Sequence, residues 1–222
     1  MLLTGMETST SSWRTMDSAQ ILRLPRLGEQ LQDGPNGDTT TPVQPTITAQ
    51  RTSSAFRDAV NKSMRVLADE ENTVFVGQSV RYDGAAIYHS LDGVPMSRRL
   101  EMPVIEDFQL GYCTGLSLTG RLPICIYPRF DFMLLCMNQL INHLDKLPIW
   151  GWKPKVIIRT RVGQKTPLDA GPQHSGNYTF PLRQMLTRIE VLEVRKPSHV
   201  TEAYALALSN EHSTLIVENP HE

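Results

Sequence analysis

Short apolar segments alternate with helix-type segments from residue 54 onward, and this alternation constrains the fold more than any other feature. Four apolar residues at helical spacing follow two serines that can cap a helix: Phe56, Val60, Met64 and Leu67. The expected strands cover residues 73–77, 99–105, 123–127, 155–159, 190–194 and 213–218. Further helices are expected from 106, over 130–146 and over 198–208. The pattern predicts an α/β fold, with a mainly parallel sheet of about six strands and helices on both faces.

Ligand residues of such a sheet gather on the loops that follow the carboxyl ends of the strands. Four stretches of this chain fall there and are the places to look for a site: residues 77–85, Glu106, residues 127–132 and residues 159–178, the last forming a long loop from about 160.

Residues 1–53 differ in composition from the rest of the chain. Serine and threonine cluster at 8–12, and Gly, Pro, Asn and Asp cluster at 33–42. Such a segment buries too little apolar surface to offset the entropy of ordering, so we expect a disordered leader. Residues 21–27 are more apolar and suggest a docking arm as an alternative. The expected organisation is therefore a leader over 1–53 and one domain over 54–222.

Composition excludes several classes of function. The chain has 222 residues and a net charge of −1, which argues against bulk binding to nucleic acid or to an anionic membrane. It has no apolar run long enough to span a membrane, and we expect no signal peptide. The three cysteines form no CxxC pair and the six histidines show no ligand spacing, so we expect buried reduced thiols and no metal site. Phosphate-loop, dinucleotide and hydrolase-elbow motifs are absent.

The order of several segments resembles the pyrimidine-binding, transketolase-like domain of the beta subunits of thiamine-diphosphate-dependent 2-oxoacid dehydrogenases. The resemblance covers about residues 54–219, and no single piece of it is specific. The matching segments are 56–64, Val74–Gly77, Tyr82–Ala85, Met102–Glu106, Gly111 through Ile124, Phe130–Phe132, Asn138–Asn142, Gln173–Ser175 and Leu215–Asn219.

This resemblance implies roles for three residues. Glu106 matches the glutamate that bonds to a ring nitrogen of the cofactor's aminopyrimidine. In this family the aminopyrimidine then takes the proton from the thiazolium carbon, and that carbon attacks a 2-oxo acid. Phe132 matches the aromatic residue that packs against the pyrimidine, although core packing explains it equally well. His174 matches a histidine near the substrate carbonyl, where it could donate a proton to a developing oxyanion. For Arg159 and Arg161 we expect a salt bridge at a strand end, with a carboxylate or phosphate contact as the alternative.

The resemblance also implies partners. Nothing in the chain resembles the segment that holds magnesium and diphosphate in the alpha subunit, so thiamine diphosphate would be shared with an alpha-type partner that carries Mg²⁺. The expected assembly is a hetero-oligomer acting on a 2-oxo acid, in the cytoplasm or in an organelle matrix.

Two departures keep other functions open. The family usually has Glu-x-Gly-Phe where this chain has Glu106-Asp107-Phe108-Gln109, and the family's second, carboxyl-terminal domain is not expected after Glu222. The alternatives are a non-catalytic scaffold with the same fold and a transferase of transketolase or deoxyxylulose phosphate synthase type.

Overall fold

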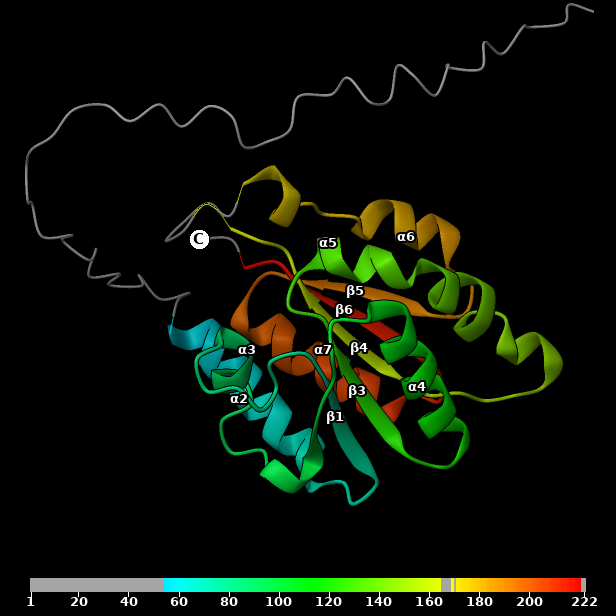
Figure 1. Cartoon of the computed structure of the whole chain (residues 1–222), viewed down its shortest axis with the longest axis horizontal. Coiled ribbons are helices and arrows are strands. Elements are labelled where there is room, and N and C mark those ends of the chain that lie inside the picture. The colour runs from blue at the N-terminus through cyan, green and yellow to red at the C-terminus, as the bar shows by residue number, and fades with distance from the viewer. Residues whose placement is uncertain (1–53, 165–168, 170, 221–222) are drawn as a thin grey trace, which may run out of the picture. The chain divides into compact units, whose positions relative to one another are not determined.

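Six parallel strands form the centre of the computed structural model, which describes residues 54–164, 169 and 171–220 (Figure 1). The expected leader at 1–53 lies outside these described residues. The strands run in the order β2-β1-β3-β4-β6-β5, and every neighbouring pair is parallel. Their bounds are β1 (Thr73–Gly77), β2 (Arg99–Glu101), β3 (Leu122–Ile126), β4 (Ile157–Arg161), β5 (Glu190–Val194) and β6 (Thr214–Glu218). The predicted α/β fold with a parallel sheet is confirmed.

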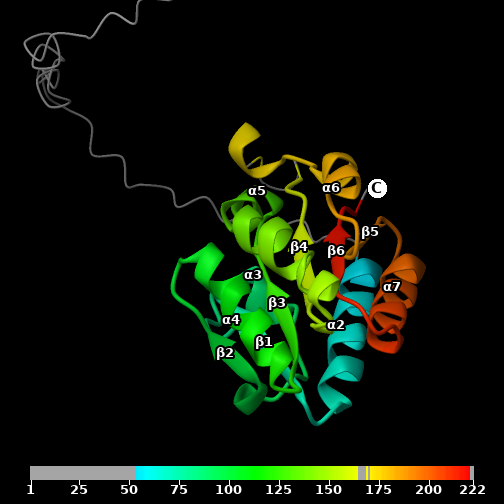
Figure 2. The same cartoon turned by 90° about the vertical axis from the view of Figure 1, so that its right-hand side faces the viewer.

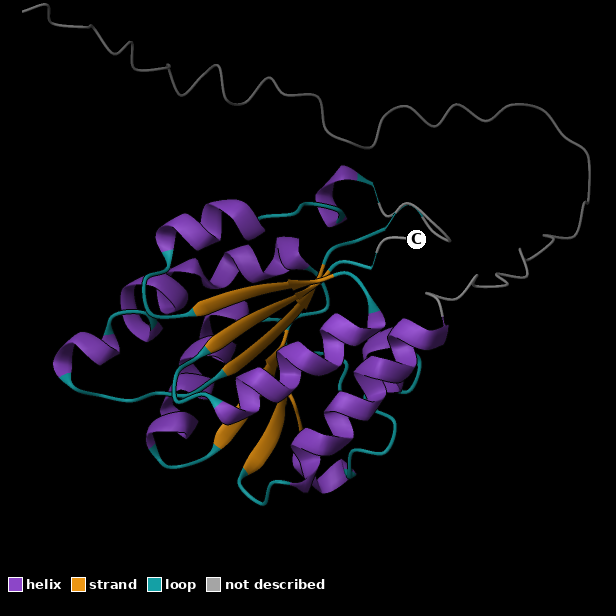
Figure 3. Cartoon of the chain, turned by 180° about the vertical axis from the view of Figure 1, so that it is seen from behind, coloured by secondary structure: helices purple, strands orange, loops and turns teal. Residues whose placement is uncertain are grey.

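Helices cover both faces of this sheet. Helices α2 (Ser54–Asp69) and α7 (Pro197–Ser209) lie together on one face, where Figures 2 and 3 show them side by side. Helix α4 (Glu106–Leu118), the segment from Phe130 to Leu144 and helix α6 (Thr179–Met185) cover the other face. Side chains alternate along each strand, so that Ile157 enters the core under α2 and α7 while Ile158 enters the opposite core.

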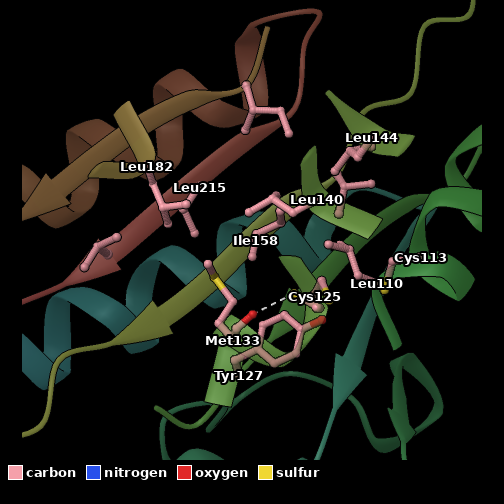
Figure 4. Close-up of a cluster of buried hydrophobic side chains, with 14 of the residues drawn as sticks. Leu110, Cys113, Cys125, Tyr127, Met133, Leu140, Leu144, Ile158, Leu182 and Leu215 are labelled. Atoms are coloured by element: carbon pink, nitrogen blue, oxygen red, sulfur yellow. Dashed lines mark hydrogen bonds between the residues drawn. The ribbon is translucent and has the colours of Figure 1, made fainter. Parts of the chain in front are cut away.

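The core under α4 contains all three cysteines, and Figure 4 shows Cys113 and Cys125 within it. Cys113, Cys125 and Cys136 are free thiols and fully buried, which confirms the expectation of buried reduced cysteines. Burial raises the pKa of Cys136 to about 12. No helix among the described residues is both long and apolar enough to cross a membrane.

The segment 130–146 departs from the single α-helix predicted for it. It consists of α5 (Phe130–Met133), a short 3-10 helix η2 (Leu134–Cys136) and a π-helix η3 (Asn138–Leu144). Right-handed helical angles persist at the junction residues Met133 and Met137, so the chain keeps its direction while its hydrogen-bond pattern changes. Apolar spacing reports the direction of a helix and not its hydrogen-bond pattern.

Several element boundaries also differ from the prediction. Strand β4 begins two residues late because the backbone amides of Lys155 and Val156 donate to serine hydroxyls instead of a neighbouring strand. Helix α7 begins at Pro197 with Lys196 as its N-cap, so Ser198 is not the cap. The expected strand at 99–105 ends at Glu101. The sequence also gave no signal for α6, for the short helix α3 (Ala86–His89) or for the 3-10 turns η1 (Met96–Arg98), η4 (Leu147–Trp150) and η5 (Pro172–His174).

Candidate functional site

Glu106 lies at the carboxyl edge of the sheet, as predicted, and is the first residue of α4. Its side chain is buried, and its Oε1 accepts a hydrogen bond of 3.1 Å from Nε2 of Gln78, which directly follows β1. Its backbone carbonyl accepts a second bond, of 2.9 Å, from the hydroxyl of Tyr127, which directly follows β3. Gln78 thus holds the carboxyl and Tyr127 holds the backbone, so that Glu106 is fixed between the ends of two adjacent strands.

A fully buried glutamine fixes the first turn of α4 to the same place. Nε2 of Gln109 donates to the carbonyl of Ile126 at 3.0 Å and contacts Sγ of Cys125 at 3.4 Å. Strands β1 and β3 also approach closely here, because a Cβ on Gly77 would lie 2.6 Å from the carbonyl oxygen of Ile126. These contacts leave little freedom for the backbone that carries Glu106.

Phe132 and His174 meet edge to face at the neighbouring part of this edge. Their ring centroids are 5.3 Å apart and the ring planes are inclined by 89°. Phe132 comes from α5, which follows β3, and His174 ends η5, in the loop that follows β4. Both side chains are half-buried. The structure therefore brings together two residues that are far apart in the sequence and that the sequence had assigned to one site.

Asp131 ties the histidine loop to α5. Its Oδ1 accepts hydrogen bonds from the hydroxyl of Tyr178 at 3.0 Å and from the backbone amide of Gly176 at 3.3 Å. The bond to Asp131 raises the pKa of the Tyr178 hydroxyl. The loop also passes very close to the chain leaving β4, since a Cβ on Gly163 would lie 1.7 Å from the carbonyl oxygen of His174. Only glycine fits at 163 without moving η5.

Arg159 makes the expected salt bridge, but it lies in the middle of β4 and not at a strand end, because β4 continues to Arg161. Its guanidinium donates to both carboxylate oxygens of Glu218, at 2.7 and 3.2 Å, and to the hydroxyl of Ser90 at 2.7 Å. Burial alone would lower the pKa of Arg159, but the Glu218 carboxylate beside it raises it. Arg161 donates to Oε1 of Gln164 at 3.1 Å, and burial lowers its pKa.

Sequence reasoning missed several residues that support this edge. Gln78, Tyr127 and Asp131 all fall within stretches that the strand ends had marked, yet no motif distinguished them from their neighbours. Among the described residues, no group of three or more His, Cys, Asp or Glu side chains could hold a metal ion.

A cavity of about 590 Å³ lies at the opposite edge of the sheet, where the strands begin, away from all the predicted site residues. The side chains that line it come from the segments that precede β4, β5 and β6, among them Trp152, Lys153 and Arg188, and from Glu190, the first residue of β5. It therefore contributes nothing to the arrangement around Glu106.

The described residues have a transketolase-like α/β fold. A split-gene transketolase, solved as an inactive beta4 tetramer, superposes with a TM-score of 0.59 at 18% identity, over 74% of this chain and 50% of that one. The transketolase of Campylobacter jejuni superposes with a TM-score of 0.61 at 13% identity, over 74% of this chain and 25% of that one. At such identities the likeness establishes the fold alone.

The sequence relatives are beta subunits, which confirms the resemblance found in the sequence. The beta subunit of acetoin:2,6-dichlorophenolindophenol oxidoreductase from Bacillus subtilis is 29% identical over 173 residues, covering 70% of this chain and 49% of the relative. The human mitochondrial beta subunit of the pyruvate dehydrogenase E1 component is 31% identical over 96 residues, covering 40% and 26%. The chain thus spans about half, or less, of the length of these curated relatives. No protein-family model matches it.

Proposed function

We propose that this chain is a beta-type subunit of a thiamine-diphosphate-dependent enzyme that acts on a 2-oxo acid. The observation that carries the proposal is the buried Glu106 carboxyl, held by Gln78 at the carboxyl edge of a transketolase-like sheet. The beta subunits among the relatives support the same assignment. An aqueous compartment, the cytoplasm or an organelle matrix, is the proposed location.

The residues at this edge fit an aminopyrimidine. Glu106 offers a buried carboxyl that can hold a proton against a ring nitrogen, and its hydrogen bond from Gln78 leaves Oε2 for that contact. Phe132 offers an aromatic surface at the same carboxyl edge of the sheet, oriented by its edge-to-face contact with His174. When bound, thiamine diphosphate supplies the nucleophilic carbon for attack on the 2-oxo group.

The roles of the remaining residues follow from their chemistry. His174 can donate a proton to the oxygen of the substrate carbonyl through a ring N–H group. Asp131 and Gly163 position the histidine through the loop and make no contact with substrate in this proposal.

An alpha-type partner completes the proposed site. It would carry Mg²⁺ and the diphosphate half of the cofactor, so that the active assembly is a hetero-oligomer. This part of the proposal rests on the resemblance to beta subunits, of whose length the chain spans about half or less.

A specific observation favours a non-catalytic scaffold as the second candidate. Phe108, two residues after Glu106, is 54% exposed and stands where the family usually has glycine. A large ring there changes the surface next to the proposed site. Transketolase-like transfer remains a third candidate within the same cofactor class.

Titration of the complex with thiamine diphosphate tests the proposal. The chain is purified with its alpha-type partner, and calorimetry with thiamine diphosphate and Mg²⁺ is followed by a screen of 2-oxo acids. We expect binding by the complex and not by this chain alone, and we expect Glu106→Gln to abolish turnover while the fold remains intact.

Glu190→Gln is the matched control, because this glutamate begins β5 at the opposite edge of the sheet. Unchanged turnover in Glu106→Gln would remove Glu106 from the mechanism. Absence of cofactor binding in every combination would favour the scaffold.

A further inference from the structure

The cavity at the amino edge of the sheet has an apolar floor formed by core residues. Its volume of about 590 Å³ is suited to one small organic molecule. Leu144 and Ile189 line it from the core under α4, where both are buried. Pro148 and Pro154 add further apolar surface. Because core residues form its floor, the shape of the cavity is set by the packed interior of the domain.

Backbone hydrogen bonds fix the two chain segments that contribute most of the lining, residues 148–154 and 187–190. The amide of Trp152 donates to the carbonyl of Leu147 at 3.3 Å, which closes the turn after η4. The buried carboxylate of Asp145 accepts from the amides of Thr187 and Arg188, at 2.9 and 2.8 Å. The lining side chains therefore start from an ordered backbone, and this lowers the entropic cost of binding a ligand.

The lining combines an accessible aromatic ring with two cations. Trp152 is 55% exposed, so its indole is accessible to a planar ring that enters the cavity. Lys153 and Arg188 are exposed, and neither forms an ion pair within the described part of the chain. An ammonium and a guanidinium beside an aromatic ring favour a ligand that joins a planar ring to an anionic group, above all a phosphate.

The acidic residues of the lining narrow this class further. Glu190 is engaged with His212, whose Nε2 lies 3.3 Å from the Glu190 Oε2. Glu211 is exposed, and its carboxylate forms no ion pair with any other described residue. A carboxylate of this kind can accept hydrogen bonds from the hydroxyls of a ribose. The lining thus offers a partner for a base, for a sugar and for a phosphate.

We propose that this cavity binds a nucleoside phosphate. The base stacks on Trp152, the phosphate lies against Lys153 and Arg188, and Glu211 accepts hydrogen bonds from the ribose. An aromatic carboxylate would satisfy the indole and the cations, but it would leave the Glu211 carboxylate without a hydroxyl to bind. The inference does not depend on the proposed function, because none of the residues assigned to the cofactor or the substrate takes part in it.

Calorimetric titration of the full chain with ADP, without any partner, is the first test. We expect saturable binding of one ADP per chain. Trp152→Ala should raise the dissociation constant about tenfold, because a stacked base is lost. Arg188→Gln should raise it by a similar factor of about ten, because a charge-assisted bond to phosphate is lost. Trp150→Ala and Arg121→Gln are the matched controls, since both residues are exposed and lie outside the lining.

Glu211→Gln tests the contact with the sugar. It should weaken the binding of ADP about tenfold and leave that of 2′,3′-dideoxy-ADP unchanged, because this analogue has no hydroxyls for the carboxylate. Circular dichroism confirms that each variant is folded. Absence of ADP binding at millimolar concentration, binding that ignores Trp152→Ala and Arg188→Gln, or binding of indole-3-acetate as tight as that of ADP would overturn the proposal.

Discussion

Gln78 and Glu106 form a buried side-chain hydrogen bond of 3.1 Å that joins the residue after β1 to the first residue of α4. Among the described residues it is the one side-chain hydrogen bond made by this carboxyl. Gln78 therefore sets the direction in which the second carboxyl oxygen of Glu106 points. Under the proposed function Gln78 is a positioning residue, since it acts through Glu106.

Gln78→Ala is expected to lower turnover of the complex about tenfold, because a hydrogen bond to a charged or proton-holding group contributes roughly 1.5 kcal/mol. The acid limb of the pH–rate profile should shift as well, which a purely structural role would not cause. Asn72→Ala, whose amide bonds to the carbonyl of Gly120 near the other end of α4, is the control. If turnover and the pH profile both stay unchanged, the bond has no part in catalysis.

Gly163→Ala should displace His174. The new Cβ would lie 1.7 Å from the carbonyl oxygen of His174, so η5 must move and the contact with Phe132 should be lost. We expect a large loss of turnover together with a lower melting temperature.

Gly151→Ala serves as the control for Gly163→Ala. Gly151 has a φ of 84°, so alanine is strained there by about 1 kcal/mol or more, but it lies at the opposite edge of the sheet. A similar loss of activity in both variants would show that destabilisation alone explains the effect.

The sequence contained most of the fold because its signals are local. Helix α2 follows from apolar spacing and lies where we predicted it, and β5 has the predicted bounds of 190–194. The long helix from Phe130 was wrong in its hydrogen-bond pattern, since apolar spacing cannot distinguish α from π turns. Helix α6 was missed because Pro181 falls within its first turn, where proline is tolerated.

The supporting residues of the site could not be predicted for a different reason. Glu106, Phe132 and His174 belong to segments that resemble a family, whereas Gln78 and Tyr178 act through contacts with residues 28 and 47 positions away. Such pairs carry no spacing signal in one sequence. Only the fold brings them together.

Removal of one charge from the buried pair of Arg159 and Glu218 should lower the free energy of unfolding more than removal of a charge from an exposed pair. Their side chains are 4% and 3% exposed, and the hydroxyl of Tyr204 also donates to Glu218. Glu218→Gln leaves a buried arginine without its counter-charge and should cost about 3–5 kcal/mol of unfolding free energy in urea. Arg195→Ala removes an exposed pair with Glu193 and should cost about 1 kcal/mol or less. Equal effects from the two changes would contradict this account.

Protonation of the Asp145 carboxylate should make the protein less stable in acid. Its buried carboxylate accepts hydrogen bonds from Lys146, from the amide and hydroxyl of Thr187 and from the amide of Arg188. Burial alone would raise the pKa of Asp145, but these bonds outweigh burial and lower it. A carboxyl whose pKa is lower in the folded state than in the unfolded state stabilises the fold at pH values above its unfolded pKa, which is about 3.9. This contribution to stability is lost as the pH falls through the folded pKa.

Asp145→Asn tests this expectation, because asparagine cannot be protonated in this range. The variant should be less stable at neutral pH, and its unfolding free energy in urea should fall less steeply than that of the wild type below about pH 4. Asp92→Asn is the control, since the Asp92 side chain is 53% exposed and should leave the slope unchanged. Parallel pH profiles for the wild type and Asp145→Asn would show that other carboxylates govern the acid response, among them Glu193, whose pKa is also lowered by hydrogen bonds that outweigh its burial.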